Sequence, residues 1–232
     1  MQIQEAAQSL LHLFFPQTCA GCGSDAIDKE QLICLSCLQR LPVTDFLSHN
    51  ENTTEKLLMG RFRFLHAASY LFYTHGSVIQ RLIHQFKYKQ RKDIGLFFGK
   101  KMGGAIQQSS RFKQIDALVP LPLHPRKEKQ RHYNQAAILC EGISSELHLP
   151  ILNKAVTRIS ASSSQTSRNR LARWQNIDGS FVLQDPDQLA GRHILLVDDV
   201  ITTGATLEAC SRELLKAPIA SLSICTLACA MK

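Results

Sequence analysis

Residues 193–206 combine an apolar run with two adjacent carboxylates and a turn rich in threonine. Residues 194–197 are apolar throughout, which predicts a strand buried on both faces, as in a parallel sheet. Asp198 and Asp199 follow directly, and ligands of open α/β sheets bind at the carboxyl ends of the strands. Two carboxylates at such an end are suited to bind the hydroxyl groups of a diol.

The turn after the acidic pair has the composition of an anion site. It consists of Thr202, Thr203, Gly204, Ala205 and Thr206, and a predicted helix follows it. Threonine hydroxyls and the free N–H groups of a helix N-terminus together favour a phosphate. A diol site beside a phosphate site fits a ribose 5-phosphate.

Two other protein classes place similar residues after an apolar run. A response-regulator receiver domain also begins with a strand and two aspartates, but it needs most of a domain after them, and only residues 200–232 follow here. No G-x-x-x-x-G-K-[ST] or G-x-G-x-x-G motif occurs, so a P-loop or a dinucleotide site is not supported. The ribose-phosphate interpretation is therefore favoured.

Four cysteines near the N-terminus have the spacing of a zinc site. They form two C-x2-C pairs separated by residues 23–33: Cys19, Cys22, Cys34 and Cys37. Four thiolates in a tetrahedron are typical of structural zinc, and the alternatives are two disulfides or two redox pairs. Gly21 and Gly23 suit the tight turn of such a knuckle. The other cysteines lie in apolar patterns and are expected to be buried core thiols.

Two further stretches carry basic residues that suit a second, more highly charged anion. Residues 126–135 are expected to form a loop between a strand ended by Pro120 and Pro122 and a helix that runs to about Leu147. Residues 159–175 are polar and are expected to be a mobile lid over the phosphates or, alternatively, a surface insertion. A solvated basic loop is the alternative for the first stretch.

Two amphipathic helices are predicted over residues 77–88 and 93–106, with Asp93 as the cap of the second. Basic residues gather around them, and most are expected to lie on solvated faces. Lys87 and Tyr88 stand together at a helix end, where a cation and an aromatic ring suit a ligand or nucleic acid.

Composition limits the class of protein. The chain has 232 residues, 44% of them hydrophobic and 20% charged, which is typical of a globular protein with a substantial core. Its net charge of +8 is compatible with polyanionic partners. No apolar run is long enough to span a membrane. Residues 1–16 predict an amphipathic helix without the basic start of a secretory signal, so the cytoplasm is the expected compartment.

Strands and helices alternate after the cysteines, which predicts an α/β fold with a parallel sheet flanked by helices. The polar residues 48–54 mark the best domain boundary. We therefore expect an N-terminal helix and a zinc-finger-like module over residues 1–48. A second domain is expected over residues 49–232.

Several motifs together resemble a known family. They are residues 194–206, the paired C-x2-C knuckles, the Val-Pro-Leu-Pro-Leu stretch at 119–123, the Tyr-Asn-Gln stretch at 133–135, and the pattern from Gln165 and Thr166 to Arg173-x-x-Asn176. The chain resembles the competence protein F (ComF) family, whose members have an amidophosphoribosyltransferase-like, type I phosphoribosyltransferase fold behind N-terminal zinc knuckles. The resemblance covers almost the whole chain.

The resemblance implies a set of site residues for 5-phosphoribosyl-1-pyrophosphate (PRPP) and Mg²⁺. Asp198 and Asp199 would hold the ribose hydroxyls and are the catalytic candidates, and residues 202–206 would bind the 5-phosphate. The pyrophosphate loop would supply Arg126, Lys127, Lys129, Arg131, Asn134 and Gln135. The flexible lid would supply Gln165, Arg170, Arg173 and Asn176, and a hood from residues 50–110 would bind the acceptor.

The chain departs from the family pattern in two places. The family commonly has Arg-Gly-Phe-Asn-Gln where this chain has His132 and Tyr133 after Arg131, and replacing glycine removes easy access to positive φ. That loop is therefore expected to follow a different path or to approach pyrophosphate less closely. In the lid, Arg168 and Asn169 stand where the family more often has Leu and Ser.

Two functions follow from the resemblance. ComF-family members are implicated in natural transformation, so one expectation is a PRPP-binding protein that acts in the uptake and processing of single-stranded DNA, with other competence proteins as partners. The alternative is an active phosphoribosyltransferase with an unidentified nitrogen nucleophile and no role with DNA.

Overall fold

A four-stranded parallel sheet forms the centre of the computed structural model, which describes residues 17–28, 31–159 and 180–230. The strand order is β1–β6–β5–β2, and every neighbouring pair is parallel. The strands are β1 (Ala67–Tyr73), β2 (Ala117–Pro120), β5 (His193–Ile201) and β6 (Ser221–Ala230). The predicted parallel sheet is confirmed. The helix expected over residues 1–16 lies outside the described residues.

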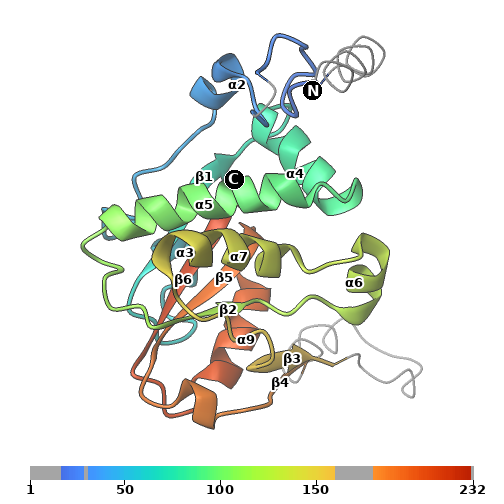
Figure 1. Ribbon diagram of the computed structural model, residues 1–232. Helices are drawn as coiled ribbons and strands as arrows, with labels where there is room; N and C mark the ends of the chain where they lie inside the picture. The colour runs from blue at the N-terminus through green and yellow to red at the C-terminus, as the bar shows by residue number, and fades with distance from the viewer. Residues whose placement is uncertain (1–16, 29–30, 160–179, 231–232) are drawn as a thin grey trace, which may run out of the picture.

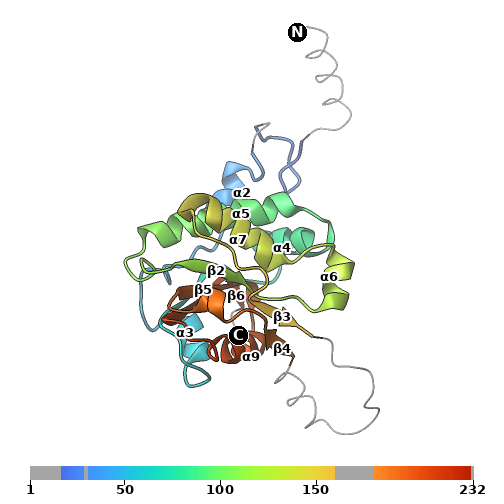
Figure 2. The same ribbon diagram turned by 60° about the horizontal axis from the view of Figure 1, so that its bottom comes forward.

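Helices cover both faces of the sheet (Figure 1). Figure 2 shows α4 (Val78–Tyr88), α5 (Lys92–Gln108) and α7 (Gln135–Leu147) on one side and α3 (Thr53–Leu58) and α9 (Ala205–Leu214) on the other. As a result, Ile194, Leu195, Leu196 and Val197 of β5 are fully buried. The apolar run is thus a strand buried on both faces, as predicted.

The register brings the carboxyl ends of the strands together. Asp198 lies opposite Thr226 of β6, and Pro120 at the end of β2 lies opposite Val197. Tyr73 at the end of β1 lies opposite Ala230. Because all four strands run in the same direction, the acidic pair, the end of β2 and the loops that follow share one edge of the sheet.

Helix α4 forms as its pattern predicts. The Ser77 hydroxyl caps it by accepting from Gln80 N, and its buried residues Val78, Ile79, Leu82, Ile83 and Phe86 recur at helical spacing. Helix α5 begins one residue earlier than predicted, and its N-cap is Arg91. Asp93 lies in the first turn and pairs with Arg91 at 2.7 Å, so the prediction of Asp93 as the cap is wrong.

Two glycines allow α5 and α7 to pack closely. A Cβ on Gly99 would lie 2.4 Å from the Leu139 carbonyl oxygen, and one on Gly142 would lie 2.6 Å from that of Leu96. No side chain fits at either position without moving a backbone. This contact fixes α7, whose N-terminus leads into the candidate site.

The basic stretch expected to be a loop is largely helical. Residues Pro125–Arg131 form α6, in which Pro125 occupies the first turn and the His124 imidazole accepts from Arg126 N at 3.2 Å. Charged residues with high helix propensity follow, which explains why the stretch does not remain extended. The predicted helix after it ends at Leu147, as expected.

A small hairpin stands beside the sheet. It pairs β3 (Val156–Arg158) with β4 (Phe181–Leu183) in antiparallel register, so that Arg158 lies opposite Phe181. Two short helical segments complete the described elements: α2 (Leu35–Gln39) and the 3₁₀ helix η1 (Asp187–Leu189). The proposed lid residues Gln165, Arg170, Arg173 and Asn176 lie outside the described residues.

The segment after the cysteines is tied to the sheet. Thr44 N donates to Tyr70 O, Phe72 N donates to Pro42 O, and the Phe46 ring packs edge-on against Phe72. Residues 42–47 thus already contact β1, while the division of the chain near residue 48 stays a prediction. No helix among the described residues has the length and hydropathy that crossing a membrane requires.

Candidate functional site

The two aspartates lie near the carboxyl end of strand β5. Asp198 Oδ1 accepts from Asp199 N at 2.7 Å, and Asp199 Oδ1 accepts from Val200 N at 2.6 Å. Lys87, from the end of α4, reaches Asp199 Oδ2 with its Nζ at 2.7 Å, and both side chains are mostly buried. The predicted ligand residue Lys87 therefore contacts the acidic pair directly.

The surroundings of Asp198 disfavour its ionised form. Burial and the neighbouring charge of Asp199 raise the pKa of Asp198 to about 8, and the cations Lys87 and Arg131 only partly oppose this. A carboxyl group that is held protonated near neutral pH loses its proton readily when a cation binds beside it. The pair is therefore suited to receive a metal ion or hydroxyl donors.

The phosphate turn follows Ile201 as predicted. Gly204 has a φ of +76°, and a Cβ there would lie 2.8 Å from Leu58 Cδ2, so only glycine fits. Gly204 is also the N-cap of α9, and no side chain caps this helix. Thr203 Oγ1 accepts only a long hydrogen bond, 3.5 Å, from Ala205 N. The first turn of α9 can therefore donate backbone N–H groups to an anion.

A cavity of about 170 Å³ lies between the acidic pair and the phosphate turn. Asp198, Asp199 and Thr206 line it, together with a set of cationic and amide side chains: Lys87, Lys127, Arg131, Asn134, Gln135 and Arg158. The structure thus brings the acidic pair, one residue of the phosphate turn and four of the six predicted pyrophosphate-loop residues into one cavity. Seven described candidates are not among its lining residues: Arg126, Lys129, Tyr88, Thr202, Thr203, Gly204 and Ala205. Arg126 and Lys129 are exposed on α6.

Gln135 is the buried amide of this cavity. Its side chain Oε1 accepts from Arg131 at 2.8 Å, while Nε2 is buried and has no partner among the described residues. A buried donor of this kind is costly unless a ligand or water accepts from it. Asn134 has a structural role as well, since it caps α7 and donates to Leu121 O at 3.0 Å.

Arg158 is a site residue that sequence reasoning missed. It lies on β3 and its guanidinium stacks over the Phe181 ring at 5.1 Å. Burial lowers its pKa, although Cys210 and Asp198 oppose the shift, and its Nε is buried without a partner among the described residues. No local pattern marks this arginine, because only the β3–β4 hairpin brings it to Asp198.

His132 keeps a left-handed backbone. Its φ is +67°, so the chain adopts at this histidine the conformation that a glycine would adopt easily, and the expectation of a different path for lack of positive φ is wrong. The turn places the Arg131 guanidinium over the Tyr88 ring at 5.4 Å. Tyr88 is thereby tied to the cavity wall while remaining 54% exposed.

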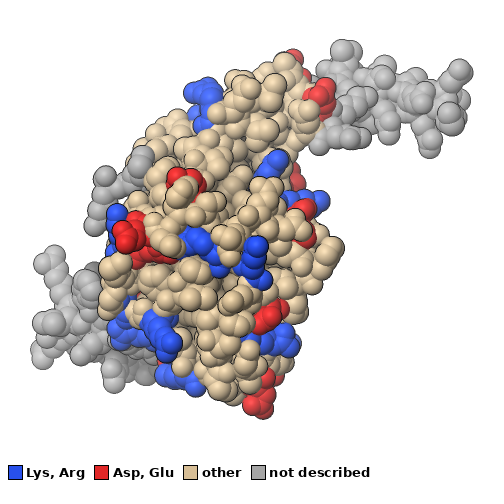
Figure 3. Space-filling model, turned by 90° about the vertical axis from the view of Figure 1, so that its left-hand side faces the viewer, with Lys and Arg blue, Asp and Glu red and all other residues tan. Residues whose placement is uncertain are grey.

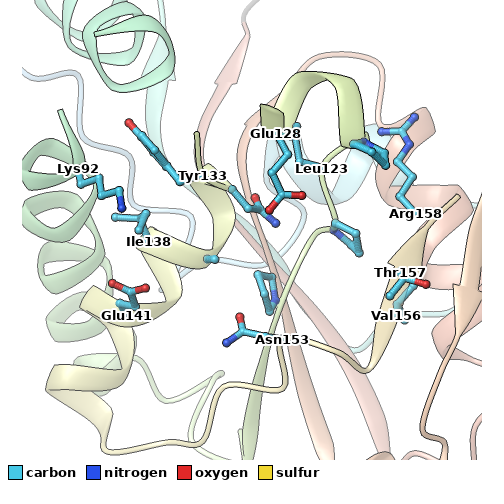
Figure 4. Close-up of a pocket in the computed structure, with 15 residues that line it drawn as sticks. Lys92, Leu123, Glu128, Tyr133, Ile138, Glu141, Asn153, Val156, Thr157 and Arg158 are labelled. Atoms are coloured by element: carbon cyan, nitrogen blue, oxygen red, sulfur yellow. The ribbon is translucent and has the colours of Figure 1, made fainter. Parts of the chain in front are cut away.

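A larger cavity of about 560 Å³ lies on the other side of α6 (Figure 4). Figure 4 shows Lys92 and Glu141 on the helices at one side and Arg158 on the hairpin at the other, with Glu128 between them. Lys92 Nζ lies 5.3 Å from the centre of the Tyr133 ring. Two cationic side chains, Lys92 and Arg158, and two carboxylates line this cavity, so its charge favours neither an anion nor a cation.

The four cysteines of the N-terminal module meet as predicted. The ligand atoms of Cys19, Cys22, Cys34 and Cys37 all lie within 4.8 Å of one another, so the cluster could hold a metal ion. A Cβ on Gly21 would lie 2.8 Å from Cys37 Sγ, and Gly23 has a φ of +80°, so both glycines are required by the turn. The remaining cysteines, Cys140, Cys210, Cys225 and Cys229, are buried core thiols as expected.

Backbone groups favour a thiolate in this cluster. Burial raises the pKa of Cys19, but N–H donors from Cys34, Cys22 and Gly21 outweigh burial and lower the pKa to about 6. The module is attached to α4, because Arg81 donates to Gly21 O at 2.7 Å and Gln85 donates to Ala20 O at 2.6 Å. Arg81 is exposed, as expected for most of the basic residues around these helices, and it has this connecting role as well.

Comparison with known proteins finds a phosphoribosyl transferase domain over residues 135–232. DNA utilization protein YhgH of Escherichia coli K12 is 32% identical over 146 residues, covering 62% of this chain and 63% of that protein. Competence protein F of Haemophilus influenzae is 32% identical over 151 residues, covering 63% and 66%. The matched region thus spans somewhat less than two thirds of each relative's length.

Among solved structures, a glutamine PRPP amidotransferase from B. subtilis matches 62% of this chain and 30% of that chain. Its sequence identity is 13% and the TM-score is 0.44. The domain match and the parallel sheet confirm the predicted fold class.

We expect the free Asp198→Asn variant to be more stable than the wild type, by a margin that grows as the pH rises. Between pH 3.8 and about 8 the folded chain holds a proton on Asp198 that the unfolded chain has released, so the stability of the wild type falls across this window. Asparagine cannot ionise. In thermal unfolding, the Tm advantage of Asp198→Asn is expected to be small at pH 4 and to grow to several degrees at pH 9, since about 2–4 °C corresponds to 1 kcal/mol.

Asp187→Asn, an exposed aspartate in η1, is the matched control and should show no such growth with pH. A Tm for Asp198→Asn that stays at or below that of the wild type at every pH would contradict the raised pKa.

Proposed function

This chain is a homologue of competence protein F with a phosphoribosyl transferase domain, as its motifs predicted, and we propose that it binds PRPP and acts in the uptake or use of DNA. The observation that carries the first part is the single cavity in which Asp198 and Asp199 lie with Thr206 and several cations. A ribose diol, a 5-phosphate and a pyrophosphate require these three kinds of group within one ligand's length.

Each part of PRPP has a matching group in this proposal. The ribose hydroxyls bind Asp198 and Asp199, and the 5-phosphate accepts from the turn at residues 202–206 and the start of α9. The pyrophosphate lies among Lys127, Arg131 and Arg158, with Gln135 Nε2 donating to it. The proposal gives the two buried donors of Gln135 and Arg158 the acceptors that they lack among the described residues.

A Mg²⁺ ion fits the same cavity. The donor set of two adjacent carboxylates is hard and anionic, and Mg²⁺ is usually held by one or two carboxylates plus substrate phosphates. When bound, the ion would neutralise negative charge on the pyrophosphate. Lys87 already pairs with Asp199, so it would continue to neutralise part of the negative charge of the acidic pair.

An active phosphoribosyltransferase is the chemical extension of this proposal. The bond from the ribose anomeric carbon to pyrophosphate breaks while a nitrogen nucleophile attacks, and positive charge develops on the ribose. The chain's contribution is to orient the ribose, neutralise the leaving pyrophosphate and exclude water. Asp198, once ionised, lies where it can stabilise that developing charge.

PRPP binding is tested by calorimetry with Mg²⁺. Replacing both aspartates, Asp198→Asn with Asp199→Asn, is expected to abolish binding, because the diol and the metal lose their ligands. Arg158→Gln is expected to weaken binding by roughly 10- to 100-fold, as for the loss of one hydrogen bond to a charged group. Arg63→Gln, an exposed arginine outside the cavity, is the control and should bind as the wild type does. Equal affinity in the wild type and the double variant would refute the assignment.

The proposed DNA role rests on the names of the relatives and on the basic residues of α6. Arg126, Lys127 and Lys129 are exposed on this helix, and Arg131 ends it beside the cavity. On the face shown in Figure 3, blue basic side chains alternate with red acidic ones and do not form one patch. The net charge of +8 alone does not identify a contact surface. The α6 helix, which gathers four basic residues in seven positions, is the proposed contact for single-stranded DNA.

Single-stranded DNA binding is expected to weaken steeply with salt, because phosphate contacts release counterions. Neutralising the four residues of α6 (Arg126→Gln, Lys127→Gln, Lys129→Gln, Arg131→Gln) should remove about three units from the slope of log affinity against log salt. A control with the same net charge neutralises four exposed residues elsewhere: Arg40, Lys56, Arg63 and Lys113. No binding at low salt, or an equal effect of both sets in fluorescence anisotropy, would exclude the α6 contact.

We further propose that the cysteine cluster holds structural zinc. Four thiolates are the donor set of closed zinc sites, and all four positions are filled by protein, so no open position for catalysis remains. The hydrogen bonds of Arg81 and Gln85 then hold α4 against a rigid module, and α4 carries Lys87.

Elemental analysis of protein purified without chelator is expected to find one zinc per chain. Cys37→Ser should lower the zinc content and the Tm, because one ligand of the tetrahedron is lost. Cys229→Ala removes a buried cysteine outside the cluster and should keep the zinc. Far less than one zinc per chain in the wild type would contradict the site.

A further inference from the structure

The 560 Å³ cavity beside α6 shares a wall with the ribose-phosphate cavity. Arg158 and Asn134 line both cavities. In Figure 4, Arg158 reaches in from the hairpin on one side, and Lys92 and Glu141 stand on the helices of the opposite side. A molecule in the larger cavity therefore lies next to the proposed pyrophosphate position and within reach of one of its residues.

Four charged side chains line this cavity without a counter-ion. They are Lys92, Glu128, Glu141 and Arg158, and none of them forms an ion pair with any residue that the structure describes. A ligand with a single charge would be attracted by two of these groups and repelled by the other two. A ligand that carries both charges can instead be placed so that each charge meets its opposite.

The remaining walls suit the organic part of such a ligand. The side chains that add apolar surface are Pro120, Pro122, Leu123, Pro125, Ile138 and Val156. The amide of Asn153 adds a hydrogen-bonding group. The cavity volume is within the usual range for small organic ligands. Size and lining thus favour a small molecule with charged ends over an inorganic ion.

Arg158 connects the two cavities. Its guanidinium stacks over the Phe181 ring, and its Nε is buried without an acceptor among the described residues. A carboxylate in the larger cavity and a pyrophosphate in the ribose-phosphate cavity would both accept from this one cation. Because two anions at one cation repel each other, each ligand would lower the affinity for the other.

We propose that the larger cavity binds an α-amino acid zwitterion, either free or as a short peptide, and that this ligand opposes PRPP at Arg158. Its carboxylate accepts from Arg158, and its ammonium group donates to Glu128. Lys92 and Glu141 face the other end of the ligand, its side chain or its second residue. The zwitterion site is independent of the proposed function, whereas the opposition to PRPP rests on it.

Ligand-observed NMR without PRPP tests the zwitterion site. The probes are the twenty free amino acids and the dipeptides dialanine and lysylglutamate, which distinguish the two sources of the ligand. At least one probe is expected to bind. Its N-acetylated and its amidated forms each lack one charge and should bind about 10-fold more weakly or worse, because one hydrogen bond to a charged group is lost. No binding by any probe, or equal binding of the blocked forms, would contradict the site.

Two variants locate the bound ligand. Glu128→Gln removes the partner of the ammonium group and should weaken zwitterion binding by about 10-fold or more, while PRPP binds as in the wild type because Glu128 does not line its cavity. Asn153→Trp, at an exposed turn of the wall, should fill the cavity and exclude the ligand. Glu146→Gln lies on α7 outside both cavities and is the matched control. Zwitterion binding that survives both Glu128→Gln and Asn153→Trp would place the ligand elsewhere and refute the site.

A PRPP titration with and without the zwitterion tests the coupling. Saturating zwitterion should raise the Kd of PRPP by roughly 5- to 150-fold, the usual range for coupling between two sites. In Arg158→Gln, which lacks the shared cation, the zwitterion should leave the Kd of PRPP nearly unchanged. If the zwitterion binds the wild type and the Kd does not rise, the opposition at Arg158 is refuted. If PRPP does not bind at all, the proposed function is refuted, and the NMR experiment alone decides the zwitterion site.

Discussion

The repulsion between Asp198 and Asp199 at the end of a buried strand is the constraint on which the site depends. Two carboxylates so close together, with little water around them, cannot both ionise without nearby cations. Burial and the charge of Asp199 leave Asp198 with a pKa near 8, while Lys87 pairs with Asp199 at 2.7 Å. A ligand that brings a cation or hydroxyl groups to the acidic pair would therefore stabilise it.

The rest of the fold brings cations to that pair from separate elements. Lys87 comes from α4, Arg131 from the end of α6 and Arg158 from the β3–β4 hairpin. The positions of these elements depend on close contacts elsewhere. Gly99 and Gly142 let α5 and α7 approach, and Arg81 ties α4 to the cysteine module. A change far from the cavity, such as disruption of the four-cysteine cluster, would thus act on α4, the helix that carries Lys87.

Local patterns predict the parts of the structure that local forces determine. The apolar run of β5, the capped amphipathic helix α4 and the four-cysteine cluster all followed from residue type and spacing. The turn at residues 202–206 and the helix after it also followed from the sequence. These features needed no knowledge of how distant segments meet.

Features that depend on tertiary contacts were not predictable in the same way. Arg158 has no pattern around it and reaches Asp198 only through the hairpin. Arg111, after α5, pairs with Glu55 and donates to Phe46 O at 2.7 Å, although the segment around residue 50 has the composition of a linker. His132 shows the converse, since the surrounding contacts impose a backbone conformation that its residue type disfavours.

A crystal structure of the protein with PRPP and Mg²⁺ would test the proposed site directly. We expect the ribose hydroxyls to lie against Asp198 and Asp199, the 5-phosphate at residues 202–206, and the pyrophosphate beside Arg131 and Arg158. Electron density for PRPP elsewhere on the protein, or a cavity that stays free of it at saturating PRPP, would contradict the central claim.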